Sequence, residues 1–255
     1  MTRTIRIGMW SGPRNTSSTM MRAFENRRDT SVVDEPFYAY YLAESGADHP
    51  MREAVLADMP QSWDAVVAGL NGPAPDDAPV AFHKHIAYHC APTGGGVETD
   101  VNALDFSWTD DQRAFLLIRD PRKMVASFAK KFADVGPIAR SLAVQRKILS
   151  RREAIAAPCP VVDADDILRD PRGMLSALCA AIDIPFSDDM LVWPPGRRES
   201  DGVWAPHWYD AVETSTGFRP YEDRAIDLTP DLQAIAEACA PSYRALFERR
   251  LRPGA

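Results

Sequence analysis

Short apolar runs alternate along this chain with longer stretches in which apolar residues recur every three or four positions. The strongest run, at 114–118, is unbroken and of the kind that is buried on both faces of a parallel sheet. Strands are predicted at 5–10, 31–33, 80–85, 114–118 and 160–163, and helices at 17–27, 121–132, 138–156, 171–182 and 230–250. This alternation predicts an α/β fold with a doubly wound, mostly parallel sheet flanked by helices on both faces.

Two segments depart from this regular alternation. Residues 38–78 have helical periodicity and end in a polar, proline-rich stretch, so we interpret them as an insertion near the site. Residues 193–221 are irregular and rich in aromatic side chains, which are expected either to cover a bound ligand or simply to pack on the core. A chain of 255 residues with these features is expected to form a single domain over 1–255.

Composition and charge narrow the possible partners. The formal net charge of −7 disfavours a general nucleic-acid binder, so any anion-binding site must be local. The four cysteines are scattered, without metal-ligand spacing, and are interpreted as reduced core residues. With no apolar stretch of about 18 residues and a strand that begins within about five residues of the N-terminus, we expect a cytoplasmic protein without membrane contact.

The loop between the first predicted strand and the first helix has the composition of an anion-binding site. It runs from Ser11 through Arg14, Asn15, Thr16, Ser17 and Ser18 to Thr19. The N-terminus of a helix offers free N–H groups and a partial positive charge, to which Arg14 and the hydroxyls add donors. The alternative is a cluster that only caps the helix. The loop is P-loop-like in position, but it lacks the second Gly and the Lys of an ATP-binding P-loop.

A second arginine stands at the end of the predicted strand 114–118. Arg119 is followed by Asp120 and Pro121, which predict a helix start, and Ser127 lies eight residues after the arginine. The guanidinium of Arg119 suits a phosphate group. Alone this pattern indicates little, because an arginine at a strand end more often forms a surface ion pair.

Together the two segments resemble the donor-binding signature of the sulfotransferase family. Residues 13–18 are similar to its Pro-Lys-Ser-Gly-Thr-Thr loop, with Arg14 in place of Lys and Thr16 in place of Gly. Arg119, Asp120, Pro121 and Ser127 match its 3′-phosphate motif, and residues 164–171 are similar to its Tyr-Glu-Asp-Leu and Asp-Pro segment. The chain looks closest to a divergent, mostly bacterial branch of that family.

The resemblance implies transfer of a sulfuryl group from 3′-phosphoadenosine 5′-phosphosulfate to a hydroxyl or amine of a small-molecule acceptor. It places Arg14 on the leaving phosphate and Asn15, Thr16, Ser17 and Ser18 around the donor. Arg119 and Ser127 are expected to bind its 3′-phosphate, with Arg219 or Arg197 a candidate to complete that site. Whether Thr16 alters donor use stays open.

The base that deprotonates the acceptor has two candidates. Glu35 follows a predicted strand and matches a glutamate that some family members use, although it could equally be a solvated carboxylate or a partner of Arg14. Lys84 and His85 resemble the Lys-Thr-His segment of the cytosolic branch, with the histidine one place earlier. His83 and His85 lie on one face of a strand, but no third ligand accompanies them, so no metal site is predicted.

Other classes of function remain alternatives. A nucleotide or small-molecule kinase shares this type of fold but should carry Gly-Lys-[Ser/Thr], and a non-catalytic nucleotide-binding protein is also compatible with the scaffold. The sequence leaves open the identity of the acceptor and the oligomeric state, a homodimer included.

Overall fold

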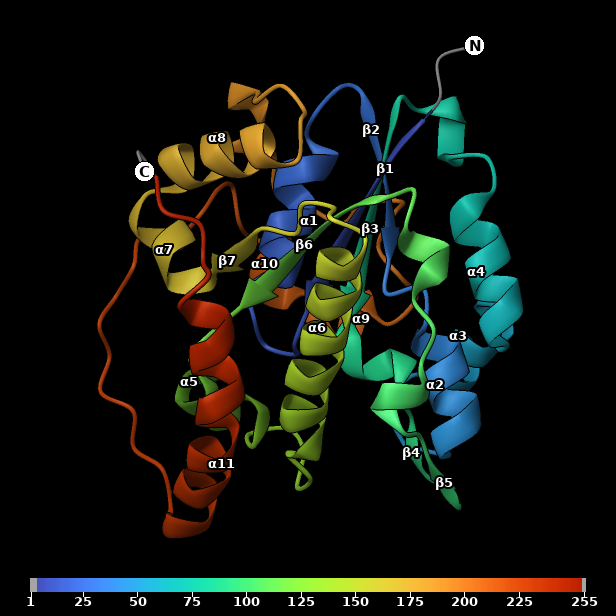
Figure 1. Ribbon diagram of the computed structural model, residues 1–255, viewed down its shortest axis with the longest axis vertical. Helices are drawn as coiled ribbons and strands as arrows, with labels where there is room; N and C mark the ends of the chain where they lie inside the picture. Colours follow the sequence, from blue (N-terminus) through green and yellow to red (C-terminus); the bar gives the residue numbers. More distant parts are fainter. Residues whose placement is uncertain (1–3, 254–255) are drawn as a thin grey trace.

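A five-stranded parallel sheet forms the centre of the computed structural model, which describes residues 4–253 (Figure 1). Its strand order is β2-β3-β1-β6-β7. The strands are β1 (Ile5–Ser11), β2 (Thr30–Asp34), β3 (Val80–Ile86), β6 (Arg113–Ile118) and β7 (Val161–Asp163). The predicted doubly wound α/β fold is confirmed, and every neighbouring pair of these strands is parallel.

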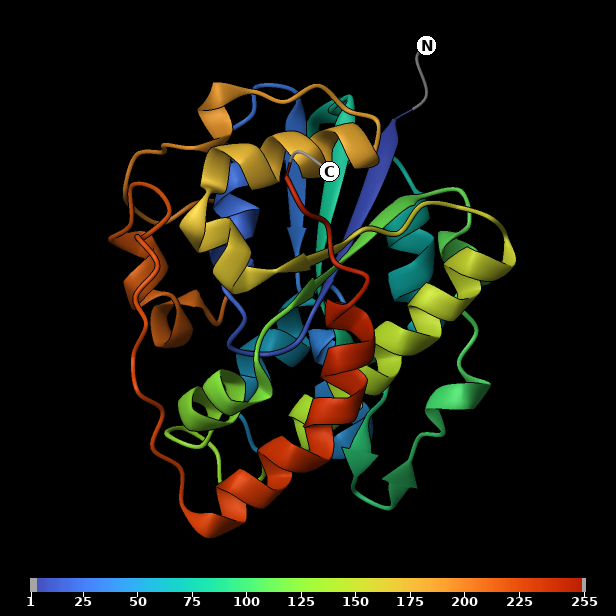
Figure 2. The same ribbon diagram turned by 60° about the vertical axis from the view of Figure 1, so that its left-hand side comes forward.

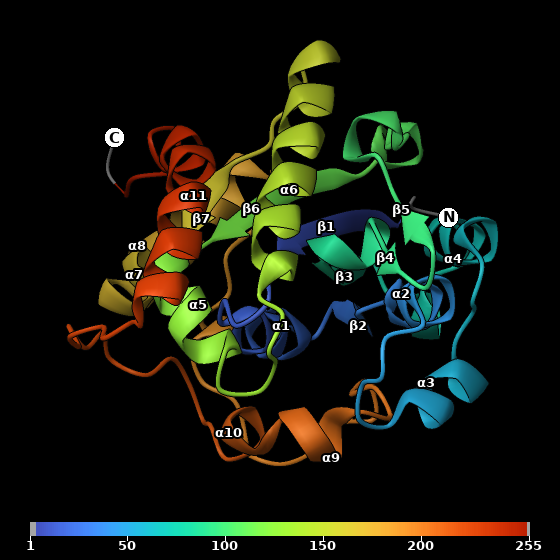
Figure 3. The same ribbon diagram turned by 90° about the horizontal axis from the view of Figure 1, so that it is seen from below.

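Side chains alternate between two hydrophobic cores, one on each face of the sheet. In β6, Phe115 packs in one core and Leu116 in the other, as the period of a strand requires. Helices α1 (Ser17–Glu25), α7 (Ala164–Arg169) and α8 (Pro171–Ala181) cover the first face. Helices α5 (Pro121–Phe128), α6 (Gly136–Ala154) and α11 (Pro230–Phe247) cover the second (Figure 3).

Strand β1 occupies the position where the winding of the sheet changes direction. The chain goes from β1 to β2 and β3 on one side and later to β6 and β7 on the other. In open α/β sheets, ligands bind at the carboxyl ends of the strands beside such a position. The loops that follow β1, β2 and β6 meet at this edge, toward which Figure 3 looks.

The segment 38–78 forms the crossover from β2 to β3. It contains α2 (Tyr38–Ser45), α3 (Arg52–Asp58) and α4 (Trp63–Asn71), of which α4 packs on the core that includes Phe106. After β3, a short hairpin pairs β4 (Thr93–Gly94) with β5 (Val97–Glu98). The described residues also include the 3₁₀ helices Pro75–Asp77, Ala87–Cys90, Val101–Ala103, Ser107–Thr109 and Asp188–Met190.

The segment 193–221, called the cap here, lies against the first face of the sheet. It contains the short helices α9 (Ala205–Trp208) and α10 (Asp210–Glu213), and the chain then runs along the outside of the molecule to α11 (Figure 2). A buried ion pair ties the cap to α1, because Arg22 Nη2 lies 2.6 Å from Asp201 Oδ2. Within residues 4–253, no helix has both the length and the apolarity that a membrane crossing needs.

Candidate functional site

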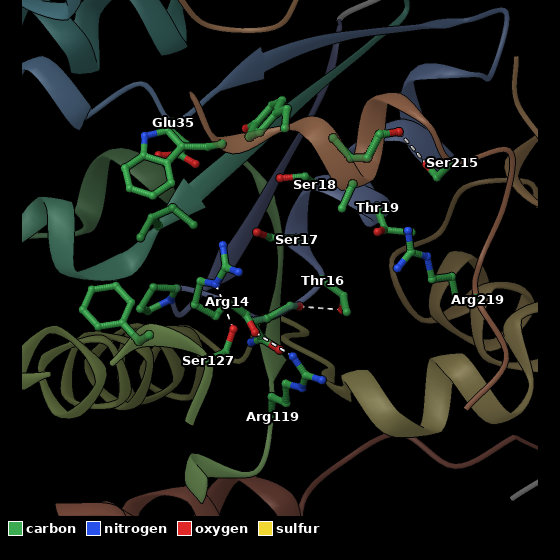
Figure 4. Close-up of a pocket in the computed structure, with 18 of the residues that line it drawn as sticks. Arg14, Thr16, Ser17, Ser18, Thr19, Glu35, Arg119, Ser127, Ser215 and Arg219 are labelled. Atoms are coloured by element: carbon green, nitrogen blue, oxygen red, sulfur yellow. Dashed lines mark hydrogen bonds between the residues drawn. The ribbon is translucent and has the colours of Figure 1, made fainter. Parts of the chain in front are cut away.

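A cavity of about 470 Å³ opens at the carboxyl edge of the sheet (Figure 4). Its wall includes every residue predicted to bind the donor, together with Glu35. These residues are Arg14, Asn15, Thr16, Ser17, Ser18, Arg119, Ser127 and Arg219. Figure 4 shows Glu35 and Arg219 near opposite ends of the group, with Arg14 and Ser17 between them.

The loop after β1 has an unusual backbone conformation. Arg14 and Thr16 both have positive φ values, of 59° and 57°. Residues other than glycine adopt this left-handed backbone conformation at a free-energy cost of about 1–2 kcal/mol. Thr16 thus has a glycine-like backbone conformation, at the position where the signature that residues 13–18 resemble has glycine. Thr16 is also the N-cap of α1 and makes no capping hydrogen bond with its side chain.

Arg14, Arg119 and Ser127 are in direct contact although more than 100 positions separate Arg14 from the other two. Arg14 Nε donates to Ser127 Oγ at 3.0 Å, and Arg119 Nη1 donates to the Arg14 carbonyl oxygen at 2.8 Å. Partial burial and the charge of Arg119 lower the pKa of Arg14. Within residues 4–253, no carboxylate forms an ion pair with Arg14, Arg119 or Arg219. Two guanidinium groups that line one cavity without a protein counter-ion among the described residues are suited to an anionic ligand.

The other loop residues differ in how much of the side chain is free for a ligand. The amide of Asn15 is buried and donates to the Leu117 carbonyl oxygen, which fastens the loop to β6. Thr16 Oγ1 donates to the Asn15 carbonyl oxygen. Ser17, Ser18 and Thr19 begin α1 and place their hydroxyls along the cavity wall (Figure 4).

Glu35 is held at the end of β2 by its backbone and its side chain. Its N–H donates to the Lys84 carbonyl oxygen at 2.9 Å, and its φ is 45°. Oε1 accepts a hydrogen bond from Lys84 Nζ at 2.6 Å, while Oε2 lies 3.9 Å from His89 Nδ1. Burial, and to a smaller degree Asp34, raise the pKa of Glu35, whereas Lys84 opposes this change. A carboxylate with a raised pKa is a stronger base than one in water.

The two other predicted catalytic residues do not line the cavity. Lys84 is fully buried behind Glu35 and contacts it directly. His85 points to the opposite face of the sheet, where its ring stacks on Trp10 with centroids 4.0 Å apart. The structure therefore brings Glu35, and not His85, to the predicted donor site. Lys84 and His85 are successive residues of β3 and point to opposite faces of the sheet, so His85 lies away from the cavity.

Sequence reasoning missed several residues of the cavity wall or gave them no role. His89 lies beside Glu35, and its ring stacks on Tyr38 with centroids 4.7 Å apart. Burial lowers the pKa of His89 well below its usual value, which keeps the ring neutral. Tyr209 comes from the aromatic cap, and its contact with the end of β2 had no local signal in the sequence.

A parallel α/β sheet with a loop of this composition between its central strand and a helix is typical of proteins that bind phosphate- or sulfate-bearing ligands. Within that class, residues 5–250 match the sulfotransferase domain family. The chain therefore belongs to the sulfotransferase domain family.

Solved structures share this fold. The chain is similar to a sulfotransferase from Alicyclobacillus acidocaldarius, with a TM-score of 0.55, 13% identity and 98% coverage of both chains. It is also similar to the sulfotransferase domain of the Synechococcus PCC 7002 olefin synthase, with a TM-score of 0.51 and 20% identity. That likeness covers 93% of this chain and 94% of the other. At these identities the likeness concerns the fold.

Curated relatives from Arabidopsis thaliana are more similar in sequence. Branched-chain-amino-acid aminotransferase-like protein 2 is 32% identical over 94% of this chain, and protein 1 of that name is 35% identical over 83%. The chain spans 41% and 36% of the length of these two proteins.

Proposed function

We propose that this chain transfers a sulfuryl group from 3′-phosphoadenosine 5′-phosphosulfate to a hydroxyl or amine of a small-molecule acceptor. The observation that carries the proposal is the pair of unneutralised guanidinium groups, Arg14 and Arg119, in one cavity with the carboxylate of Glu35. A cationic corner suits the donor, and a carboxylate in the same cavity suits removal of a proton from the acceptor.

The polar groups around the loop fit a doubly phosphorylated ligand. Arg119 Nε is buried without a hydrogen-bond partner in residues 4–253, and the N-terminus of α1 has no side-chain cap. Free N–H groups at a helix N-terminus bind phosphate or sulfate oxygens. Arg14 and the hydroxyls of Ser17 and Ser18 would hold the 5′ end of the donor, and Arg119, Ser127 and Arg219 its 3′-phosphate.

Each of the proposed residues has a distinct task in the transfer. The bound donor would supply the sulfuryl group and a phosphate leaving group. Arg14 stabilises negative charge that develops on that phosphate. Glu35 accepts the proton of the attacking hydroxyl or amine on its carboxylate, and Lys84 keeps that carboxylate ionised from behind. Catalysis then depends on holding these groups on two sides of one small cavity.

Calorimetry with adenosine 3′,5′-bisphosphate and with ATP tests this proposal. We expect tighter binding of the bisphosphate, because Arg14 and Arg119 in one cavity can each contact one of its two phosphates. Arg119→Ala should weaken that binding by about tenfold to a hundredfold. A preference for ATP would favour the kinase alternative and contradict the proposal.

A further inference from the structure

A buried cluster of three side chains lies behind Glu35, and we call Asp34, Lys84 and Tyr209 the clamp. Lys84 Nζ donates to Asp34 Oδ1 at 2.7 Å, to the Tyr209 hydroxyl at 2.7 Å and to Glu35 Oε1 at 2.6 Å. The Tyr209 hydroxyl in turn donates to Asp34 Oδ2 at 2.6 Å. All three donor positions of the ammonium group are therefore used, and only one of them acts on Glu35.

The three members of the clamp come from three separate parts of the fold. Asp34 and Lys84 are paired across β2 and β3, which directs both side chains to the same face. Tyr209 comes from the cap, between α9 and α10, and is 4% exposed. The side chains of Lys84 and Asp34 are each 1% exposed, whereas that of Glu35 keeps 13% and reaches the cavity. Glu35 and Tyr209 both line the cavity, and Glu35 links the ammonium group of Lys84 to the space where an acceptor would bind.

We propose that Tyr209 is a positioning residue for the transfer reaction, acting through Asp34 and Lys84 to fix the orientation of the Glu35 carboxylate. This inference rests on the proposed function in taking Glu35 as the base. It adds a role for the cap, since the base is fully oriented only when the cap is docked and Tyr209 completes the cluster.

The charges of the cluster explain why one neutral hydroxyl matters. Asp34 and Glu35 compete for a single ammonium group, and the Tyr209 hydroxyl supplies a second donor to Asp34. Without this hydroxyl, Asp34 would draw Lys84 more strongly, and the hydrogen bond to Glu35 would weaken. Burial, followed by the charge of Asp34, raises the pKa of Tyr209 well above its usual value, so the hydroxyl remains a donor at neutral pH.

Tyr209→Phe is the direct test, because it removes the hydroxyl and keeps the ring. Groups that face Glu35 from the packed elements are Asp34, Lys84, Tyr38, Tyr88, His89 and Tyr209. We expect the protonation midpoint of Glu35 to move to higher pH. Carboxyl ¹³C resonances of the ligand-free chain measure this midpoint, and the Glu35→Gln variant assigns the resonance of Glu35. We also expect kcat to fall about tenfold to a hundredfold, with the KM for the donor unchanged within about twofold.

Tyr243→Phe is the matched control. Tyr243 also donates to a buried carboxylate, at 2.9 Å from Asp163 Oδ2, but its ring is half-buried and does not line the cavity. It should leave both the Glu35 midpoint and kcat unchanged. Lys84→Met should raise the Glu35 midpoint further than Tyr209→Phe, provided that circular dichroism shows the variant to be folded.

The readouts separate failure of the clamp from failure of the proposed function. A folded Tyr209→Phe variant with the wild-type Glu35 midpoint and wild-type kcat would overturn the clamp, even if the donor is turned over and Glu35→Gln is inactive. If the wild-type chain does not use the donor, the proposed function fails. The carboxyl titration then still decides whether Tyr209 controls Glu35.

Discussion

At the scale of single residues, Arg14 carries the charge that matters most for the proposed chemistry. Its guanidinium lines the same cavity as Arg119 without a protein counter-ion among the described residues, and its Nε is oriented by Ser127. Arg14→Ala should lower kcat by about 10²–10³-fold, the effect of removing one preorganised donor from a developing charge. Steady-state kinetics with the sulfuryl donor measures this change.

Arg122→Ala provides the comparison for Arg14. Arg122 is exposed, lies one turn beyond Arg119 and does not line the cavity. Its loss should change kcat less than twofold, since its guanidinium makes a long hydrogen bond of 3.4 Å to the carbonyl oxygen of Ile226 and takes no part in the cavity wall. Equal losses in both variants would mean that the effect is one of general charge and would remove Arg14 from its assigned role.

The choice between Glu35 and His85 as the base is also a question about single residues. We expect Glu35→Gln to lower kcat by about 10²–10⁴-fold, because Gln keeps the shape but accepts no proton. His85→Asn should affect stability rather than chemistry, because the ring packs on Trp10 away from the cavity. Rates measured side by side at saturating donor would decide, and an active Glu35→Gln with an inactive His85→Asn would reverse our assignment.

At the scale of elements, the cap depends on a buried ion pair with α1. The side chains of Arg22 and Asp201 are 1% and 0% exposed, and Asp201 also accepts the N–H of Arg198. Asp201→Ala should lower the free energy of unfolding by about 3 kcal/mol, because it leaves a buried guanidinium with only Glu25 as counter-ion. Urea unfolding and hydrogen exchange over 198–213 would measure the loss.

Asp189→Ala is the exposed counterpart of that change. Asp189 lies 4.0 Å from the largely exposed side chain of Arg28, an arrangement that contributes little to stability. The free energy of unfolding of this variant should fall by less than about 0.5 kcal/mol. If Asp201→Ala proves equally mild, the cap is held by its aromatic packing and not by the ion pair.

The elements that sequence could predict are those with a strong local pattern. The apolar run of β6 and the Asp120-Pro121 start of α5 appear where the pattern placed them, although α5 ends at Phe128 and not near Phe132. Arg14 and Arg119 lie in one cavity, as expected where the carboxyl ends of parallel strands share one edge of the sheet. These features depend on neighbouring residues and on the general geometry of parallel sheets.

The contacts of the clamp and the choice between Glu35 and His85 could not be predicted from the local sequence pattern. All seven residues of β3 are buried, so alternation separates Lys84 from His83 and His85 but does not tell which face meets the cavity. Tyr209 contacts Asp34 across 175 positions, which only the docking of the cap determines. Contacts of this kind are set by packing between elements and carry no short-range signal.

At the scale of the whole molecule, buried neutral histidines should make stability depend on pH. Burial lowers the pKa of His83 and of His49 to about 4, and lowers those of His85 and His89 well below the usual value. Below about pH 6.5 the unfolded chain binds protons at these rings that the folded chain does not bind, so stability must fall as pH falls. Asp163 acts in the opposite direction, because burial raises its pKa to about 6 and the folded chain gains a proton there.

The magnitudes favour net destabilisation in acid. Between pH 7 and pH 5, a histidine with a folded pKa of about 4 lowers the free energy of unfolding by about 2 kcal/mol. Over the same interval Asp163 raises the free energy of unfolding by about 1 kcal/mol. We therefore expect the urea midpoint to fall steadily from pH 7 to pH 5. His83→Gln should flatten that dependence, and the exposed His207→Gln should not. A midpoint that is constant over this range would show that the histidine rings take up protons in the folded chain. Both ring nitrogens of His85 are buried without a hydrogen-bond partner among the described residues, which argues against protonation of that ring in the folded chain.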